Sequence, residues 1–198
     1  MRPVCDGEAA SALIEMLAGR LNDWRVLVNN ASVFTPDSVD ALDEAVSREA
    51  MQVNAVTPAR MAQAFLGQAR SQGGRRVIQF TDQKLANPNP DFFSYTISKH
   101  AADAAARMMA MVHRGDDRLY TLAPGAILAS HDQSAKEAEI SHRMNLLQRR
   151  TGADEVAEAA LFLAEGPLAS GETLYVDSGQ HLLAQDRDVL YLARGESL

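Results

Sequence analysis

Four short apolar segments alternate with longer helical patterns along this chain. The apolar segments are Trp24–Val28, Arg75–Thr81, Arg118–Ala123 and Glu172–Val176. The helical patterns cover Ala9–Leu21, Ser38–Gln68, Tyr95–Val112 and Asp154–Leu163. Strands that alternate with helices in this way form a parallel sheet, because each connection has to cross back over the sheet. The sequence therefore predicts an α/β fold with a doubly wound parallel sheet, in a single domain over residues 1–198.

Local signals refine this outline. Asp6 or Ser11 is a candidate cap for the first helix. Pro58 lies inside the pattern Ser38–Gln68 and removes one backbone donor, so we expect a kink near Asn54. Residues 129–150 are polar with weak periodicity, which suits a substrate-loop flap with a helix in it. The tail from Asp177 to Leu198 reads as irregular.

Composition excludes several classes of function. The net charge is −7 and no large Lys/Arg cluster exists, so we expect no nucleic-acid partner. The single Cys5 and five scattered His residues predict no disulfide and no metal site. No apolar run approaches the roughly 18 residues of a membrane span, and the N-terminus does not resemble a signal peptide. We expect a cytoplasmic protein without membrane contact.

Tyr95 and Lys99 are the first candidates for chemistry. Residues four apart lie on one face of a helix, so the ammonium can approach the phenol and lower its pKa. The same spacing also fits an ordinary amphipathic surface pair. Small polar residues Asn29–Ser32 follow the first strand, at the sheet edge where ligands bind in α/β folds.

Five motifs in register resemble the short-chain dehydrogenase/reductase family between about Arg25 and His181. They are Asn29-Asn30-Ala31, Asn54 within a helix, Tyr95-x-x-x-Lys99, Pro124-Gly125, and Val176-Asp177-x-Gly179. The resemblance implies a Rossmann-like fold and an NAD(P)H-dependent oxidoreductase that reduces a C=O or C=N bond of a small molecule. NADP(H) is favoured over NAD(H).

The resemblance also implies roles for residues. Tyr95 is the expected proton donor, Lys99 binds the nicotinamide ribose, and Asn54 holds a water that links Lys99 to solvent. The residues expected around the cofactor are Asn30, Ala31, Tyr95, Lys99, Pro124, Gly125 and Ile127. Gly125 could also be the hinge of the flap, although Pro-Gly is equally a plain strand stop.

The chain departs from the family at Asp82, where the family usually has a Ser that donates to the substrate oxygen. An ionised carboxylate cannot donate. An Asp here resembles the pteridine-reductase branch, in which a carboxylate can pair with ring N–H groups, so we count Asp82 as catalytic and expect a pterin-like substrate. Phe92 or Phe93 is a possible stacking wall. Alternatives are generic carbonyl reduction, or Asp82 as a plain turn cap with the Phe pair in the core.

A second departure concerns the Gly-rich phosphate turn. None of the twelve glycines forms Gly-x-x-x-Gly-x-Gly or Gly-x-Gly-x-x-Gly. We therefore expect a chain that lacks the first strands of the family fold, with a bare edge at Trp24–Val28 and weak dinucleotide binding. The alternative function is a catalytically silent or fragmentary member that acts as a binding or assembly subunit.

Assembly is a final expectation. Family members pair through the Tyr/Lys helix, and here that helix carries small and soft side chains between Ala101 and Met111. A homodimer or homotetramer follows from the resemblance, whereas spacing alone fits core packing equally well. Leu190, Tyr191 and Leu192 are candidates to reach a neighbouring subunit.

Overall fold

Four parallel strands form the sheet of the computed structural model, which describes residues 7–113, 115–130 and 132–197. The strands are β1 (Val26–Asn29), β2 (Arg76–Phe80), β3 (Arg118–Pro124) and β4 (Thr173–Val176), in the order β1-β2-β3-β4. In the register, Val77 lies opposite Leu27 and Leu119. The predicted Rossmann-like parallel sheet is confirmed.

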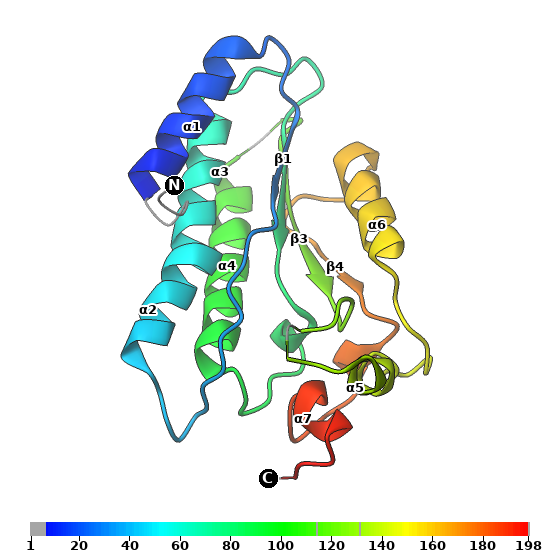
Figure 1. The fold of residues 1–198 in the computed structure, drawn as a ribbon. Helices are drawn as coiled ribbons and strands as arrows, with labels where there is room; N and C mark the ends of the chain where they lie inside the picture. Colours follow the sequence, from blue (N-terminus) through cyan, green and yellow to red (C-terminus); the bar gives the residue numbers. More distant parts are fainter. Residues whose placement is uncertain (1–6, 114, 131, 198) are drawn as a thin grey trace.

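Helices cover both faces of this sheet (Figure 1). On one side lie α1 (Gly7–Arg20), α3 (Thr57–Gln68) and α4 (Phe93–Val112), and on the other lies α6 (Ala153–Glu165). Successive side chains of a strand point to opposite faces of the sheet, so the residues of each strand pack alternately into two separate cores.

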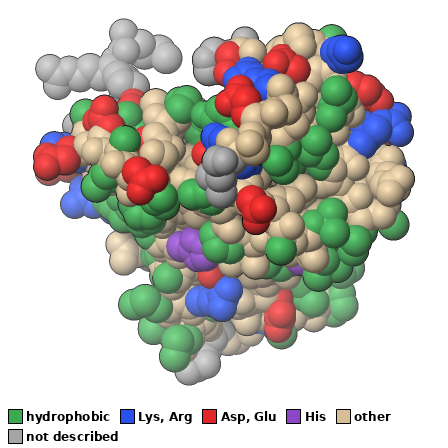
Figure 2. Space-filling view, turned by 90° about the horizontal axis from the view of Figure 1, so that it is seen from below, with side chains coloured by type: hydrophobic (Ala, Val, Ile, Leu, Met, Phe, Trp, Pro, Cys, Tyr) green, Lys and Arg blue, Asp and Glu red, His purple; other side chains and the backbone are tan. Residues whose placement is uncertain are grey.

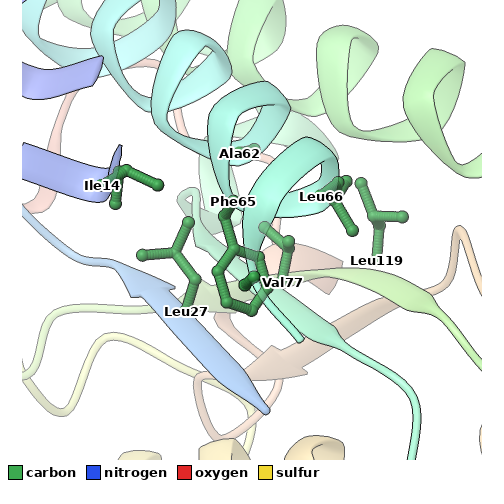
Figure 3. Packing of buried hydrophobic residues seen from close by; sticks show 8 residues of the cluster. Ile14, Leu27, Ala62, Phe65, Leu66, Val77 and Leu119 are labelled. Carbon is green, nitrogen blue, oxygen red and sulfur yellow. The ribbon is translucent and has the colours of Figure 1, made fainter. Parts of the chain in front are cut away.

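The core under α1 and α3 contains Phe65, which reaches from α3 toward Leu27 and Val77 of the sheet (Figure 3). The core under α6 contains the neighbouring strand residues Ile78 and Tyr120, packed with Val156 and Leu163. Consecutive apolar residues of the strands, such as Val77 and Ile78, thus contribute to the two cores on opposite faces of the sheet.

The long helical segment before β2 is interrupted where Pro58 predicts a kink. Helix α2 (Glu44–Met51) passes into a π-helical turn, Gln52–Val56, and then into α3. Pro58 has no N–H to offer the carbonyl of Asn54 one turn earlier. The expected distortion near Asn54 is therefore confirmed. The helix begins at Glu44 and not near Ser38, because Asp43 Oδ1 accepts from the amides of Ala45 and Val46.

Two predictions about the chain ends need correction. Ser11 does not cap α1, since its hydroxyl donates to the carbonyl of Gly7 within the helix; Asp6 lies outside the described residues. The tail is not wholly irregular either. A 3-10 turn covers Gln180–Leu182, and α7 (Val189–Ala193) begins after Asp188, whose carboxylate accepts from the amide of Leu190.

The carboxyl end of the sheet is covered by α5 (Ala135–Ser141), which lies in the predicted flap, and by α7 (Figure 1). Arg194 joins them through ion pairs with Glu137 and Asp132, each at 3.0 Å. Figure 2 looks at the molecule from this side and shows acidic and basic side chains interspersed. Among the described residues, no helix has both the length and the apolar character needed to cross a membrane.

Candidate active site

A cavity of about 490 Å³ opens at the carboxyl ends of β2 and β3. Its walls come from the ends of these strands, from Tyr95 and Lys99 on α4, from the flap, and from Asp188 to Leu190 in the tail. This volume lies within the range of about 300–1,000 Å³ that is usual for small-molecule sites. The fold therefore brings segments that are far apart in the chain, from Asn30 to Leu190, together around one site.

Tyr95 and Asp82 form a hydrogen-bonded pair in this cavity. The phenol of Tyr95 donates to Asp82 Oδ2 over 2.7 Å. Burial, and then the charge of Asp82, raises the pKa of the Tyr95 phenol well above its ordinary value. Burial also raises the pKa of the Asp82 carboxyl. The pair keeps a proton in a water-poor site, as a proton donor requires.

The pKa of Tyr95 is not lowered overall, contrary to the prediction, because burial and Asp82 outweigh the effect of Lys99. Its Nζ lies 5.4 Å from the centre of the Tyr95 ring, whereas the carboxylate of Asp82 touches the phenolic oxygen itself. A negative partner in contact favours the neutral phenol, and burial acts in the same direction. The helical spacing brings Lys99 close to Tyr95, but it does not determine whether the pKa of Tyr95 rises or falls.

Lys99 is a buried cation whose ammonium has unused hydrogen-bond donors. Its pKa is lowered to about 8 by burial, although Asp82 opposes the shift. Within the described residues, Nζ donates one hydrogen bond, to the carbonyl of Phe80 at 3.3 Å. An ammonium has three donors. Lys99 therefore has the capacity to bind hydroxyl groups of a ligand in the cavity.

Asn54 is fully buried and its side chain connects two parts of the fold. Oδ1 accepts from the amide of Val33 at 2.8 Å and from the hydroxyl of Ser32, while Nδ2 donates to the carbonyl of Val33 and to Ser98 Oγ. All four hydrogen-bonding positions of the amide are used. The predicted water beside Lys99 could then bind only the main-chain carbonyl of Asn54.

We expect Asn54→Ala to lower the free energy of unfolding by roughly 2–4 kcal/mol, because it leaves buried groups of Val33 and Ser98 unpaired. Urea denaturation followed by circular dichroism measures the change. The control is Asn22→Ala at an exposed position, where we expect a change within about 0.5 kcal/mol. Equal losses in both variants would contradict the assigned role.

The residues expected around the cofactor converge on the cavity, with one exception. Asn30, Tyr95, Lys99, Pro124, Gly125 and Ile127 line it, whereas Ala31 is exposed and does not. Gly125 allows β3 and β4 to end close together. A Cβ at this position would lie 2.7 Å from the Cβ of Asp177 and 2.6 Å from Gln180 Oε1. This packing explains the glycine, independently of any hinge.

Phe34 and Phe80 line the cavity, and not the predicted Phe92 or Phe93. Phe92 is 2% exposed and stacks on Phe34 with ring centres 3.9 Å apart, and Phe93 lines a separate groove. Phe34 lines the cavity and meets the Tyr95 ring edge-on at 4.7 Å. Its only signal in the sequence is its position shortly after the polar end of β1.

The sequence did not identify Lys84 or the tail as parts of the cavity wall, which they are. Lys84 Nζ, nearly buried, pairs with Asp188 Oδ2 at 2.8 Å and with Asn89 Oδ1 at 2.7 Å. Leu190 is buried in a cluster with Phe92 and Tyr95 of its own chain. Leu190 is therefore buried within its own chain and, contrary to the prediction, does not reach a neighbouring subunit, whereas contact of Tyr191 and Leu192 with a neighbour stays a prediction.

The parallel sheet makes this a Rossmann-like protein, and a phenol, a carboxylate and a buried lysine lie together at the carboxyl ends of its strands, where α/β folds bind ligands. A protein-family model described as "Enoyl-(Acyl carrier protein) reductase" matches residues 3–181. The chain belongs to the short-chain dehydrogenase/reductase family of oxidoreductases, in the pteridine-reductase-like branch.

Three similar proteins support the assignment to this family. The dihydromonapterin reductase of Escherichia coli O6:K15:H31 is 25% identical over 160 residues, which cover 80% of this chain and 67% of that protein. Human dehydrogenase/reductase SDR family member 4 is 30% identical over 78% of this chain and 58% of its own length. The crystal structure of FolM alternative dihydrofolate reductase 1 from Brucella suis, in complex with NADP, has a TM-score of 0.83. It is 31% identical and the match covers 91% of this chain and 73% of that one.

Proposed function

We propose that the protein is an NAD(P)H-dependent reductase of a C=O or C=N bond in a flat, pterin-like heterocycle. The observation that carries this proposal is the pair of Tyr95 and Asp82 at the cavity, where other family members have a Ser as donor. The names of the Escherichia coli and Brucella suis relatives support the same substrate class.

The spare donors of buried Lys99 fit the ribose hydroxyls of a nicotinamide cofactor. Asn30, Pro124, Gly125 and Ile127 would flank the nicotinamide and its ribose. The bound cofactor supplies the hydride. The Brucella suis structure contains NADP, which favours NADP(H) over NAD(H). No Gly-rich turn occurs in the sequence, so no residue of this chain is assigned to the pyrophosphate.

In this proposal the residues of the chain handle the proton. The phenol of Tyr95 would give its proton to the oxygen or nitrogen of the reducible bond. The nearby Lys99 ammonium stabilises the phenolate that results. Asp82, in contact with the phenolic oxygen, is placed to relay a proton from solvent water to the Tyr95 phenolate or to accept a hydrogen bond from a ring N–H.

The lack of a Gly-rich turn favours a second function, a silent subunit that binds or assembles without catalysis. A folded protein that turns over no carbonyl or imine with NADPH would support it. For either function we propose a cytoplasmic homo-oligomer that pairs through α4. That helix leaves Ile97, Met108 and Met111 exposed by 42%, 66% and 69% on one side. Sedimentation of Met108→Lys tests this contact, with dissociation as the expected result.

Asp82→Ser tests the proposed substrate class. The change replaces an acceptor with the hydroxyl donor of ordinary carbonyl reductases, so we expect dihydropterin turnover to fall about 100-fold and ketone turnover to rise or hold. NADPH absorbance measures both rates, and exposed Asp186→Ser is the control. Wild-type turnover of simple ketones but not of dihydropterins would refute the pterin-like substrate.

A further inference from the structure

We propose that Gln83 recognises the substrate by pairing its carboxamide with the lactam edge of a planar heterocycle. The inference rests on the proposed function and makes its substrate class more specific. A lactam edge carries an N–H donor beside a C=O acceptor, which is the complement of a carboxamide. Gln83 lies between Asp82 and Lys84, and all three line the cavity.

The side chain of Gln83 is buried without a partner. The residue is 5% exposed, and its Oε1 is buried with no hydrogen bond. Buried polar groups in folded proteins are nearly always paired, so each exception calls for an explanation. The other such atoms among the described residues, Ser71 Oγ and Arg76 Nε, belong to residues that do not line this cavity. Oε1 is shielded from solvent in this conformation, so the carboxamide has to turn toward the cavity that Gln83 lines before a ligand there can satisfy it.

The residues on either side of Gln83 are fixed by their own contacts. Asp82 accepts from Tyr95 and from the amide of Lys84, at 2.7 and 2.9 Å. The Lys84 ammonium is held by Asp188 and Asn89. Both neighbours of Gln83 are therefore held in place, and the Gln83 carboxamide is the uncommitted group between them. A rigid support of this kind suits a recognition residue.

The other residues of the cavity wall further restrict the class of ligand that fits. Asp82 adds an acceptor beside the carboxamide, which suits a ring with a second N–H or amino group. Phe34 offers a flat apolar face on the same cavity. A simple ketone has only an acceptor and would leave Gln83 Oε1 unpaired, whereas a fused lactam ring would satisfy donor and acceptor together.

Gln83→Met tests the inference because it keeps the length of the side chain and removes the amide. We would measure by calorimetry, with NADP⁺ present, the binding of pterin and of quinoxaline, a planar two-ring compound without a lactam. The wild type should prefer pterin. The variant should lose about 10- to 100-fold of that preference, the loss expected for two hydrogen bonds, while quinoxaline binding stays within about two-fold.

Thermal unfolding without ligand gives a second reading. Removing an unpaired buried amide should raise the Tm of Gln83→Met by about 2–4 °C. The matched control is Gln180→Met, since Gln180 also lines the cavity but accepts from the amide of Ala126 at 3.0 Å. Its Tm should fall. A structural role for Gln83 would instead lower the Tm of both variants.

The inference is overturned if Gln83→Met binds pterin as the wild type does, or if the wild type binds neither ring or does not prefer pterin. These results concern binding only. The proposed reductase activity is judged separately, by NADPH-dependent turnover and its loss on changing Tyr95. A chain that prefers pterin through Gln83 but reduces nothing would therefore support the inference and refute the proposed function.

Discussion

Tyr95→Phe is expected to lower kcat by about 10²- to 10⁴-fold, the usual contribution of a positioned acid or base. The change removes only the phenolic O–H, which is the proposed source of the proton and lies 2.7 Å from Asp82 Oδ2. Substrate affinity should change by less than about ten-fold, because one neutral hydrogen bond is of modest net strength. NADPH absorbance at a series of substrate concentrations separates kcat from KM.

The control for this prediction is Tyr175→Phe. Tyr175 is a half-buried residue of β4 that stacks on His181 and does not line the cavity. Its replacement should leave kcat within about two-fold, as expected for a residue that does not contact the reacting atoms. A rate for Tyr95→Phe within ten-fold of the wild type would show that another group supplies the proton. Asp82, whose pKa burial raises, would then be the nearest candidate.

The sheet could be predicted from the sequence because its signals are local. Apolar runs such as Arg76–Phe80 stand between helical patterns, and Pro58 marks the distortion that places Asn54. The contacts that close the cavity are not local. Lys84 pairs with Asp188 and Asp91 pairs with Arg187, both between segments far apart in the chain. No periodicity reveals such pairs, so the tail was predicted as irregular.

The pKa of Tyr95 shows a different limit. The spacing of Tyr95 and Lys99 correctly predicts that their side chains share a face of α4 and meet at the cavity. The sign of a pKa shift depends on burial and on whichever charge lies nearest. Here that charge is Asp82, which the sequence places at the end of β2 but not against the phenol. The motif therefore identifies which side chains meet at the cavity, whereas the fold determines whether each of them is protonated.

Lys99→Met is expected to stabilise the protein while it removes activity. Burial lowers the pKa of Lys99 from 10.5 to about 8 in the folded chain. Between these pH values the unfolded chain binds more protons, so the free energy of unfolding rises with pH across this window. Below about pH 8 the folded chain carries the full penalty of the buried ammonium. At pH 7 we expect Lys99→Met to add about 1–3 kcal/mol to the free energy of unfolding.

The gain in stability should shrink between about pH 8 and 10.5 and vanish above it, since unfolded and folded wild type are then both neutral at Lys99. Activity should fall about 10²- to 10³-fold, because the phenolate of Tyr95 loses its cation. Urea denaturation at several pH values measures the first effect and NADPH turnover the second. The exposed Lys136→Met is the control for both. A loss of stability at pH 7 would instead show that the contacts of Lys99, including that with the Phe80 carbonyl, outweigh the penalty of its burial.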